Sequence, residues 1–160
     1  MTDEIKTISQ YSSTYTEPYK KTYVSCRAVT VKDDRILLSH ESETGFYMSP
    51  GGGLEENETA EECVKRELRE EAGYIVDVIS PFVTVNEYCY DTLYISRYFL
   101  CEVRDTCERQ LTETEKAKGM VPAWLTIDEA KAVFATYAQH TPDKESLYRR
   151  ELTILNEYTK

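Results

Sequence analysis

Three glutamates lie close together between Glu67 and Glu71 of this 160-residue chain. Glu67, Glu70 and Glu71 are spaced i, i+3 and i+4, which places their side chains on one face of a helix. Like charges at this spacing destabilise a helix by roughly 0.2–0.5 kcal/mol per pair. A hard divalent cation such as Mg²⁺, Mn²⁺ or Ca²⁺ would relieve the repulsion, because such ions prefer oxygen ligands. The pattern therefore indicates a metal site.

A glycine run and a helix must position these carboxylates. Glycines 51–53 permit unusual φ angles and close approach of the backbone to a ligand. Thr59 is the predicted N-cap, because it begins a Thr-x-x-Glu capping box, and Gly73 suits the left-handed position after a helix end. Between them an apolar stripe recurs every four residues, at Ala60, Val64, Leu68 and Ala72. Loop and helix together have the geometry of a metal–phosphate site.

The same charges have a simpler interpretation. An acidic run taken alone is usually a solvated helix face, and Glu61 and Glu62 are explained by the macrodipole at the helix N-terminus. Arg66 and Arg69 are only two cations for three glutamates, and we expect each on another part of the helix surface. The glycine run combined with the full spacing favours the metal site.

The segment from Gly52 to Tyr74 resembles the signature box of Nudix hydrolases. Seven fixed positions match the box: Gly52, Glu58, Arg66, Glu67, Glu70, Glu71 and Gly73. At about 7% usage for each residue type, a chance match has a probability on the order of 10⁻⁸ per starting point. Tyr74 departs from the box, where the family usually has an aliphatic residue, and we expect it to pack at the start of a strand.

The resemblance implies a hydrolase that depends on Mg²⁺ or Mn²⁺. Its substrate would be a nucleoside diphosphate linked to another moiety, either a nucleoside triphosphate or a nucleotide conjugate, cleaved at the diphosphate. The resemblance also implies that the metal ligands are Glu67, Glu70, Glu71 and the backbone carbonyl of Gly51. Within the box, Glu70 and Arg66 are the predicted catalytic residues, and Arg66 matches the arginine that orients carboxylates, here Glu67 and Glu58.

Residues outside the box complete the predicted site. In many family members a later glutamate holds metal or acts as a base, and Glu113 and Glu115 are the candidates here, with Glu115 preferred. Either could instead be a solvated loop charge. Within the box, Gly52 and Gly53 are expected to contact the substrate.

Aromatic residues near the box could stack on a nucleotide base. Tyr47 and Tyr90 are the candidates, with Tyr88 and Trp124 also near in sequence. Most of the 13 tyrosines must pack ordinarily, and we expect Trp124 in the core.

Length and composition limit the function. A chain of 160 residues is most simply one domain, and 41% hydrophobic with 30% charged residues is typical of soluble globular proteins. The net charge of −10 argues against general nucleic-acid binding, although a metal would still allow an anionic substrate. Five cysteines without a C-x-x-C pair indicate reduced thiols in the cytoplasm. No apolar run suits a signal peptide or membrane span.

The order of elements predicts an α/β fold. The polar segment 1–21 fits either a flexible tail or a packed edge, because tyrosines recur at 11, 15, 19 and 23. We predict a hairpin from 23–31 and 36–38, an extended stretch at 46–48, an antiparallel pair from 75–86 and 93–103 with a turn at 88–91, and an edge strand at 120–125.

Two more helices follow, from a second capping box at Thr126 to about Ala138, and from Pro142 to about Tyr158. Such an order predicts a mixed β-sheet with helices on both faces. The resemblance implies the Nudix α/β/α sandwich.

Two other functions are consistent with the sequence. A Nudix-fold module could bind a nucleotide or nucleotide sugar as a sensor without hydrolysis, although such modules typically have a degraded box and this box is intact. A purely structural acidic helix is the third interpretation, which Mg²⁺ binding would contradict. The sequence does not identify the substrate, and a monomer and a homodimer both remain open.

Overall fold

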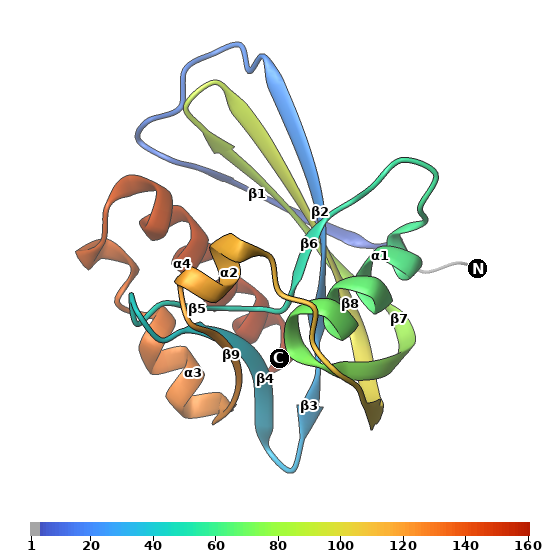
Figure 1. Ribbon diagram of the computed structural model, residues 1–160. Helices are drawn as coiled ribbons and strands as arrows, with labels where there is room; N and C mark the ends of the chain where they lie inside the picture. The colour runs from blue at the N-terminus through green and yellow to red at the C-terminus, as the bar shows by residue number, and fades with distance from the viewer. Residues whose placement is uncertain (1–3) are drawn as a thin grey trace.

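The structure is a computed structural model that describes residues 4–160. Within these residues one sheet of five strands runs in the order β1, β7, β8, β2, β6 (Figure 1). Its strands are β1 (Lys6–Tyr11), β7 (Tyr74–Cys89), β8 (Thr92–Thr106), β2 (Lys21–Val29) and β6 (Gly51–Gly53). The pairs β1–β7 and β2–β8 are parallel, whereas β7–β8 and β2–β6 are antiparallel, so the sheet is mixed.

The second sheet is built around β4 (Arg35–Glu41). β4 pairs along its length with β9 (Met120–Thr126) and, on its other side, with the short strands β3 (Val31–Lys32) and β5 (Tyr47–Met48). All of these pairs are antiparallel. Pro122 lies in β9 at the edge of this sheet, where a missing backbone donor costs no ladder hydrogen bond.

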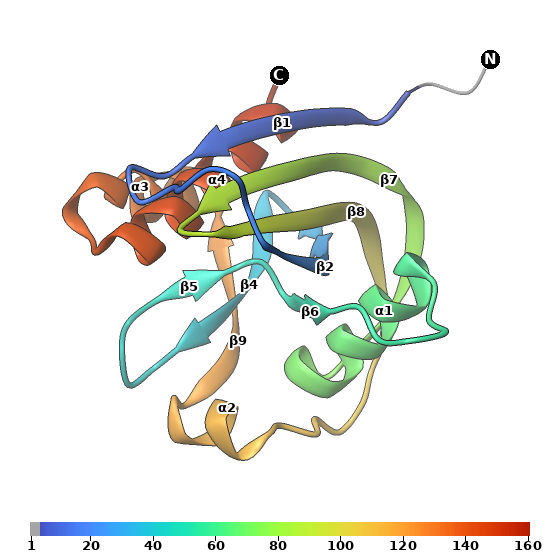
Figure 2. The same cartoon turned by 90° about the horizontal axis from the view of Figure 1, so that it is seen from above.

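Helices cover both sides of the strands (Figure 2). On one side lies α1 (Ala60–Glu67), continued by a π-helical turn over Leu68–Ala72. On the other lie α3 (Ile127–Phe134), a 3₁₀ turn at Tyr137–Gln139, and α4 (Pro142–Tyr158). A short helix, α2 (Glu113–Ala117), precedes β9.

Each layer of helices has its own buried cluster. Val64, Leu68 and Ala72 of the α1 segment pack with Leu37 of β4, whereas Ile36 and Leu38 of β4 belong to the cluster beneath α3 and α4. The alternation follows from the period of two along a strand. The α/β class and its helix-covered mixed sheet are thus confirmed, with the strands divided between two sheets.

The predicted helix ends are confirmed. Thr59 accepts a hydrogen bond from the Glu62 amide at 3.1 Å, and Gly73 is left-handed with φ 75°. The amide of Gly73 donates to the carbonyl of Leu68, five residues back, so the last turn is π rather than α. Such π turns occur frequently at functional sites.

Three predicted elements differ from the structure. Residues 31–36 form the predicted hairpin through Asp33 and Asp34, but 23–29 pair with β8 and β6 instead. The β7–β8 turn consists of Tyr90 and Asp91 and is shorter than the predicted turn at 88–91. Helix α3 ends at Phe134, before the predicted end at about Ala138. Helix α2 was not predicted, although Thr112 and Glu115 form a reciprocal capping box of the same Thr-x-x-Glu type.

The N-terminal segment is a packed edge in residues 4–21, and residues 1–3 lie outside the described chain. β1 adds to β7, and the ring of Tyr11 stacks on Tyr88 at 4.5 Å between centroids. Tyr15 and Tyr19 pack on the same Tyr88 ring at 5.2 and 5.9 Å. Tyrosines spaced by four therefore surround one partner on β7.

Tyr74, the departure from the box, begins β7 as expected and has a specific partner. The indole N–H of Trp124 donates to the Tyr74 hydroxyl at 3.0 Å, and the two rings meet edge to face. Trp124 is partly buried against the α1 cluster, in agreement with its predicted packing role.

We predict that Tyr74→Phe lowers the free energy of unfolding by about 1–2 kcal/mol, because it leaves the partly buried indole N–H unpaired. Urea denaturation measures the change. Tyr23→Phe is the matched control, since Tyr23 is 58% exposed and should stay within about 0.5 kcal/mol of the parent. Equal stability of the two variants would show that the hydrogen bond contributes nothing.

Candidate active site

Arg66 lies at the centre of the carboxylates that the sequence singled out. Its guanidinium donates to both oxygens of Glu58, from Nε at 2.6 Å and from Nη2 at 3.1 Å. Nη1 donates to Glu67 at 2.9 Å and to Glu70 at 3.2 Å, and Nη2 also donates to the carbonyl of Gly53 at 3.1 Å. One side chain therefore joins the glycine strand, the following loop and the helix.

This arrangement corrects the expectation that Arg66 would lie on another part of the helix surface. Its side chain reaches back over the glutamates because the spacing from Arg66 to Glu70 is i, i+4. Arg69 is exposed, and within residues 4–160 it forms no ion pair. Part of the carboxylate repulsion is thus relieved within the protein.

Glu58 is the carboxylate that Arg66 binds most fully. The bidentate hydrogen bonds from Arg66 lower the pKa of Glu58 to about 2, and the Glu55 amide adds a further donor at 3.1 Å. The same contacts raise the pKa of Arg66 above its ordinary value. Bidentate pairs of this kind are among the stronger hydrogen-bonded contacts in proteins.

Glu71 points the opposite way, into the protein. Its side chain is buried, and it accepts hydrogen bonds from the Ser39 hydroxyl of β4 and from the Gly51 amide at 3.3 Å. Burial raises the pKa of Glu71 to about 7, although Ser39 and the charge of Arg27 act in the opposite direction. A nearby cation would favour the ionised form.

Glycine is required where the strand meets the helix. A Cβ on Gly52 would lie 2.5 Å from the carboxyl carbon of Glu67, and a Cβ on Gly51 would lie 2.2 Å from the carbonyl oxygen of Cys26. A Cβ on Gly53 would meet nothing within 4 Å. The Glu67 carboxylate therefore lies in direct contact with the backbone of Gly52. Burial raises the pKa of Glu67 despite its contact with Arg66.

The three predicted metal ligands are close in sequence but differ in environment. Glu70 is 39% exposed in its side chain, Glu67 is 16% exposed, and Glu71 is buried. No three His, Cys, Asp or Glu side chains among residues 4–160 already converge on a point suited to a metal. Arg66 contacts Glu67 and Glu70, whereas Ser39 contacts Glu71.

A family model for the NUDIX domain matches residues 20–150, which include the Arg66 cluster and every strand except β1. This match covers most of the chain. The protein belongs to the Nudix family.

Relatives and solved structures agree with this assignment. The chain is 33% identical over 108 residues to a MutT-like protein of Streptomyces ambofaciens (66% of this chain, 65% of that one), and 41% identical over 46 residues to the Nudix hydrolase YvcI of Bacillus subtilis (28% and 29%). It thus spans less than two thirds of these curated relatives. A NUDIX hydrolase from Nitrosomonas europaea superimposes with a TM-score of 0.68 at 26% identity, covering 87% of this chain and 89% of that one.

Nudix structures of lower identity share the fold alone. An ADP-ribose pyrophosphatase from Streptococcus suis superimposes with a TM-score of 0.58 at 18% identity, covering 86% of this chain and 92% of that one. A UDP-X diphosphatase superimposes with a TM-score of 0.61, also at 18% identity, covering 89% and 67%.

The two glutamates proposed from outside the Nudix box occupy helix α2. Glu113 has a side chain that is 93% exposed and pairs with Lys116 at 3.3 Å. Glu115 caps its own helix by accepting from the Thr112 amide at 2.9 Å, and its charge contributes to the raised pKa of Glu67. Of the two, Glu115 is the one whose charge acts on Glu67, whereas Glu113 pairs with Lys116 at the surface.

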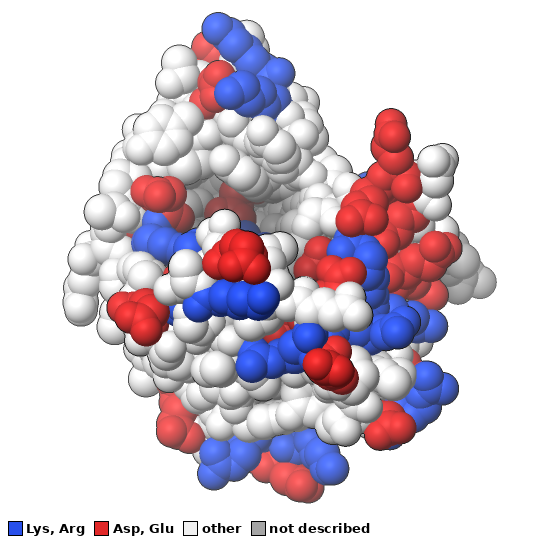
Figure 3. Space-filling view, in the orientation of Figure 1, with Lys and Arg blue, Asp and Glu red and all other residues white. Residues whose placement is uncertain are grey.

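The two candidate aromatic residues, Tyr47 and Tyr90, lie in different environments. Tyr47 stacks on His40 at 4.1 Å and packs against the cluster beneath α3 and α4, so its contacts are those of a packing residue. Tyr90, with 53% exposure, lies at the β7–β8 turn and lines a pocket beside the Nudix box. The space-filling view shows a hollow on this face, with acidic side chains gathered beside it over α1 and the preceding loop (Figure 3).

Arg27 of β2 is a residue that the sequence did not single out. Its Cγ would lie 2.7 Å from a Cβ on Gly51, and its Nη1 donates to the Ser49 carbonyl at 2.8 Å. Arg27 thus lies between Glu71 and the pocket that Tyr90 lines. Ser39 was missed as well, because no local pattern marks a strand residue that will contact a helix 32 positions later.

We predict that Arg66→Gln raises the pKa of Glu58 from about 2 toward its ordinary value of about 4.3. In the parent, the pair stabilises the fold above about pH 4 and this contribution is lost as pH falls toward 2. NMR titration of the Glu58 carboxyl in a chelating buffer measures the shift. An unchanged low value in Arg66→Gln would assign the effect to other contacts.

Proposed function

We propose that this Nudix protein hydrolyses the diphosphate linkage of a nucleoside diphosphate joined to another moiety, with Mg²⁺ or Mn²⁺ as cofactor. The substrate class includes nucleoside triphosphates and nucleotide conjugates. The observation that carries the proposal is that Glu67 and Glu71 contact the Gly51–Gly53 strand, while Arg66 binds both Glu67 and Glu70. A solvated acidic face would need none of these contacts.

The residues fit a hard divalent cation. Glu67 and Glu71 are carboxylates whose pKa values are raised by burial, so a positive charge beside them would be favourable. Their oxygens, those of Glu70 and the Gly51 carbonyl are ligands that Mg²⁺ accepts. Binding would require Glu67 and Glu70 to exchange part of their contact with Arg66 for the ion.

A bound cation would polarise the phosphoryl oxygen and lower the pKa of a bound water. The protein's own groups supply the rest of the chemistry. Arg66 orients Glu67 and Glu70 through one Nη1 atom. Glu70 is the most exposed of the three glutamates, and we assign it as the base that accepts a proton from the attacking water. Glu115 is a second candidate for this role.

One further assignment belongs to this proposal. Five cysteines, an odd number without a C-x-x-C pair, suit a reducing compartment, so we place the activity in the cytoplasm. Within residues 4–160, the helices are all too short or too polar to cross a membrane.

The alternative is a Nudix module that binds a nucleotide or nucleotide sugar without cleaving it. The retained Arg66 cluster and the intact glutamates favour hydrolysis, because a module that only binds has no need of three carboxylates beside a diphosphate. Incubation with nucleoside triphosphates, dinucleotides and nucleotide sugars in Mg²⁺ separates the two. Binding without release of phosphate, pyrophosphate or nucleotide would establish the sensor.

Metal affinity should depend on Gly52 and not on Gly53. We predict that Gly52→Ala weakens Mn²⁺ binding at least about 10-fold, because the new Cβ displaces the Glu67 carboxylate. Gly53→Ala is the matched control, with open space at its Cβ. Titration calorimetry measures affinity and urea denaturation confirms folding. Equal affinities in two folded variants would remove Glu67 as a ligand.

Turnover should depend on the glutamates of the box. We predict that Glu70→Gln and Glu71→Gln each lower kcat with Mg²⁺ by at least about 10², because an amide loses the charge yet keeps the shape. Glu61→Gln on the exposed face of α1 is the control and should stay within about twofold. Near-parental turnover in both box variants would contradict the assignment, whatever the substrate.

A further inference from the structure

Strand β1 forms one edge of the five-stranded sheet. It pairs with β7 on one side, and its other side has no strand partner within residues 4–160 (Figure 2). The glycine strand β6 lies at the opposite edge of the sheet, so β1 takes no part in the proposed chemistry. An unpaired edge presents a row of backbone amides and carbonyls, which can pair with a strand of another chain.

The backbone groups that face this open edge belong to the odd-numbered residues of β1. The Ser12 amide donates to a carbonyl of β7 at 2.8 Å, so alternation along the strand turns the amides and carbonyls of the even-numbered residues toward β7. The Tyr11 carbonyl, by contrast, accepts from Nη2 of Arg149 at 2.9 Å. The amides and carbonyls of Thr7 and Ser9 therefore point outward, away from the sheet.

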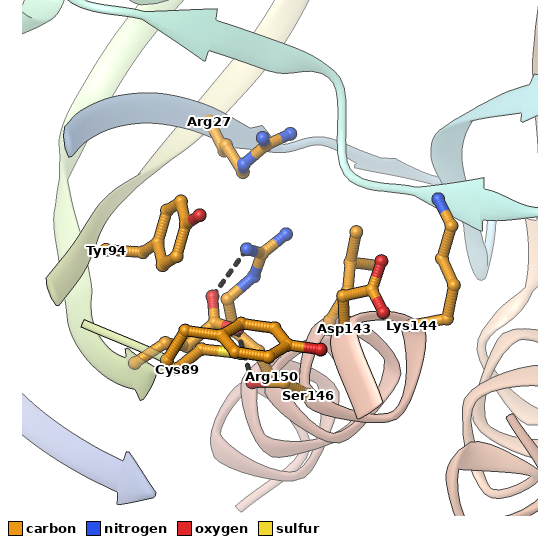
Figure 4. A pocket seen from close by; sticks show the side chains of 10 residues that line it. Arg27, Cys89, Tyr94, Asp143, Lys144, Ser146 and Arg150 are labelled. Atoms are coloured by element: carbon orange, nitrogen blue, oxygen red, sulfur yellow. Dashed lines mark hydrogen bonds and ion pairs between the residues drawn. The ribbon is translucent and has the colours of Figure 1, made fainter. Parts of the chain in front are cut away.

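A buried network holds β1 in place at this edge. The side-chain amide of Gln10 donates to the carbonyl of Ser146 in α4 at 2.8 Å and to its hydroxyl at 3.2 Å. Ser146 and Arg150 in turn both donate to Glu87 of β7 at 2.7 Å (Figure 4). All four side chains are buried. The open edge is thus a fixed template on a strand that is anchored to both α4 and β7.

The edge lacks the features that usually protect such strands, which are prolines, bulges and outward charges. From Ile5 to Tyr11 the chain contains no proline, and the register of β1 with β7 is continuous. The charged residue in this stretch, Lys6, is held by Glu157 of α4 at 3.0 Å. The face of β1 that points away from α4 carries four exposed and uncharged residues, namely Ile5, Thr7, Ser9 and Tyr11.

An antiparallel pairing of two β1 strands is self-complementary when it is centred on Ile8. On either side of this centre, Thr7 of one copy faces Ser9 of the other, and their outward backbone groups can exchange both hydrogen bonds. Ile8, which is half-buried, meets its own counterpart. Ile5 and Tyr11, which are 46% and 56% exposed, lie opposite each other. A centre at Ser9 would instead place Tyr11 opposite Thr7 and leave Ile5 outside the pairing.

Helix α4 adds charge complementarity to the same two-fold arrangement. It runs antiparallel to β1, with Arg149 bound to Tyr11 and Glu157 bound to Lys6. The two-fold axis exchanges the ends of β1, so Arg149 of one copy comes beside Glu157 of the other, twice. Opposite charges that meet in this way favour the correct partner and suppress others. They also offset locally the repulsion between two chains of net charge −10.

We propose that the open edge of β1 is a docking surface for a second copy of this chain. The two β1 strands pair in antiparallel orientation about Ile8 and join the two five-stranded sheets into one continuous sheet. Both glycine strands remain at the outer edges of this sheet. The dimer is therefore independent of the proposed hydrolysis and of any metal.

Sedimentation equilibrium between micromolar and millimolar concentrations tests the association. We expect a reversible dimer with twice the mass of the chain. Ser9→Pro removes an outward amide while keeping the bonds to β7, and it should weaken the dimer at least about 10-fold. Ser9→Ala is the matched control, because it keeps the amide and should associate like the parent. Urea denaturation establishes that both variants are folded.

A disulfide cross-link tests the register. Opposite residues of a non-hydrogen-bonded antiparallel pair lie about 4.5 Å apart at Cα, which is within the range of a disulfide. Mild oxidation of Ile8→Cys should therefore give a covalent dimer, seen by non-reducing electrophoresis and mapped by mass spectrometry. Ser9→Cys is the control, because its opposite residue is Thr7, and the parent chain gives the background from its own cysteines.

A protein that stays monomeric at every concentration overturns the inference. So does a dimer that folded Ser9→Pro leaves intact, or one in which Ile8→Cys gives no cross-link between the two copies of position 8, because the interface would then lie elsewhere. If Ser9→Pro does not fold, the cross-link decides.

Discussion

The site depends on one hydrogen-bonded cation. Arg66 holds Glu58, Glu67, Glu70 and the carbonyl of Gly53, which belong to the loop, the helix and the glycine strand. Without it, the carboxylates of α1 would repel one another in a partly buried place. The shortest contact of Arg66 is with Glu58, and this contact anchors the guanidinium beside the helix.

A second polar network fixes the opposite wall of the site. Glu151 of α4 accepts from the amide and hydroxyl of Ser49, at 3.1 and 2.6 Å, and from Arg150 and Tyr98. Ser49 lies just before the glycine strand, so these bonds tie the entry of that strand to the C-terminal helix. Burial opposes the charge of Glu151, but Arg150 and Arg27 keep its pKa below the ordinary value. Such buried charges are costly unless every partner is present, and here they position backbone rather than add stability.

The two networks meet at strand β2. Its Arg27 and Cys26 face Gly51 and Gly52 across an antiparallel pair, and the close approach of Cys26 to Gly51 excludes any side chain there. On its other side β2 pairs in parallel with β8, which reaches the pocket at Tyr94. The glycine run is therefore held between a rigid strand and a helix, which gives its backbone groups fixed directions. A flexible phosphate loop would lack this preorganisation.

Sequence alone determined what depends on neighbours along the chain. The caps at Thr59, Gly73 and Thr126, the strand pair around residue 90, and the box spacing all follow from local geometry and residue chemistry. Helix α2 was not predicted, although Thr112 and Glu115 form the same kind of capping box, so the sequence did contain a signal for it.

Only the tertiary structure decided how the residues meet. Residues 23–29 leave the predicted hairpin because β8, some 70 positions away, offers a longer partner. The contacts of Glu71 with Ser39 and of Arg150 with Glu87 join segments 32 and 63 residues apart. No periodicity encodes such pairs, since a side chain's partner across the core is set by how the layers pack. The sequence thus predicted which residue types form the site. It did not predict that Glu71 would be buried, that Glu67 and Glu70 would both contact Arg66, or that Glu70 would be the most exposed.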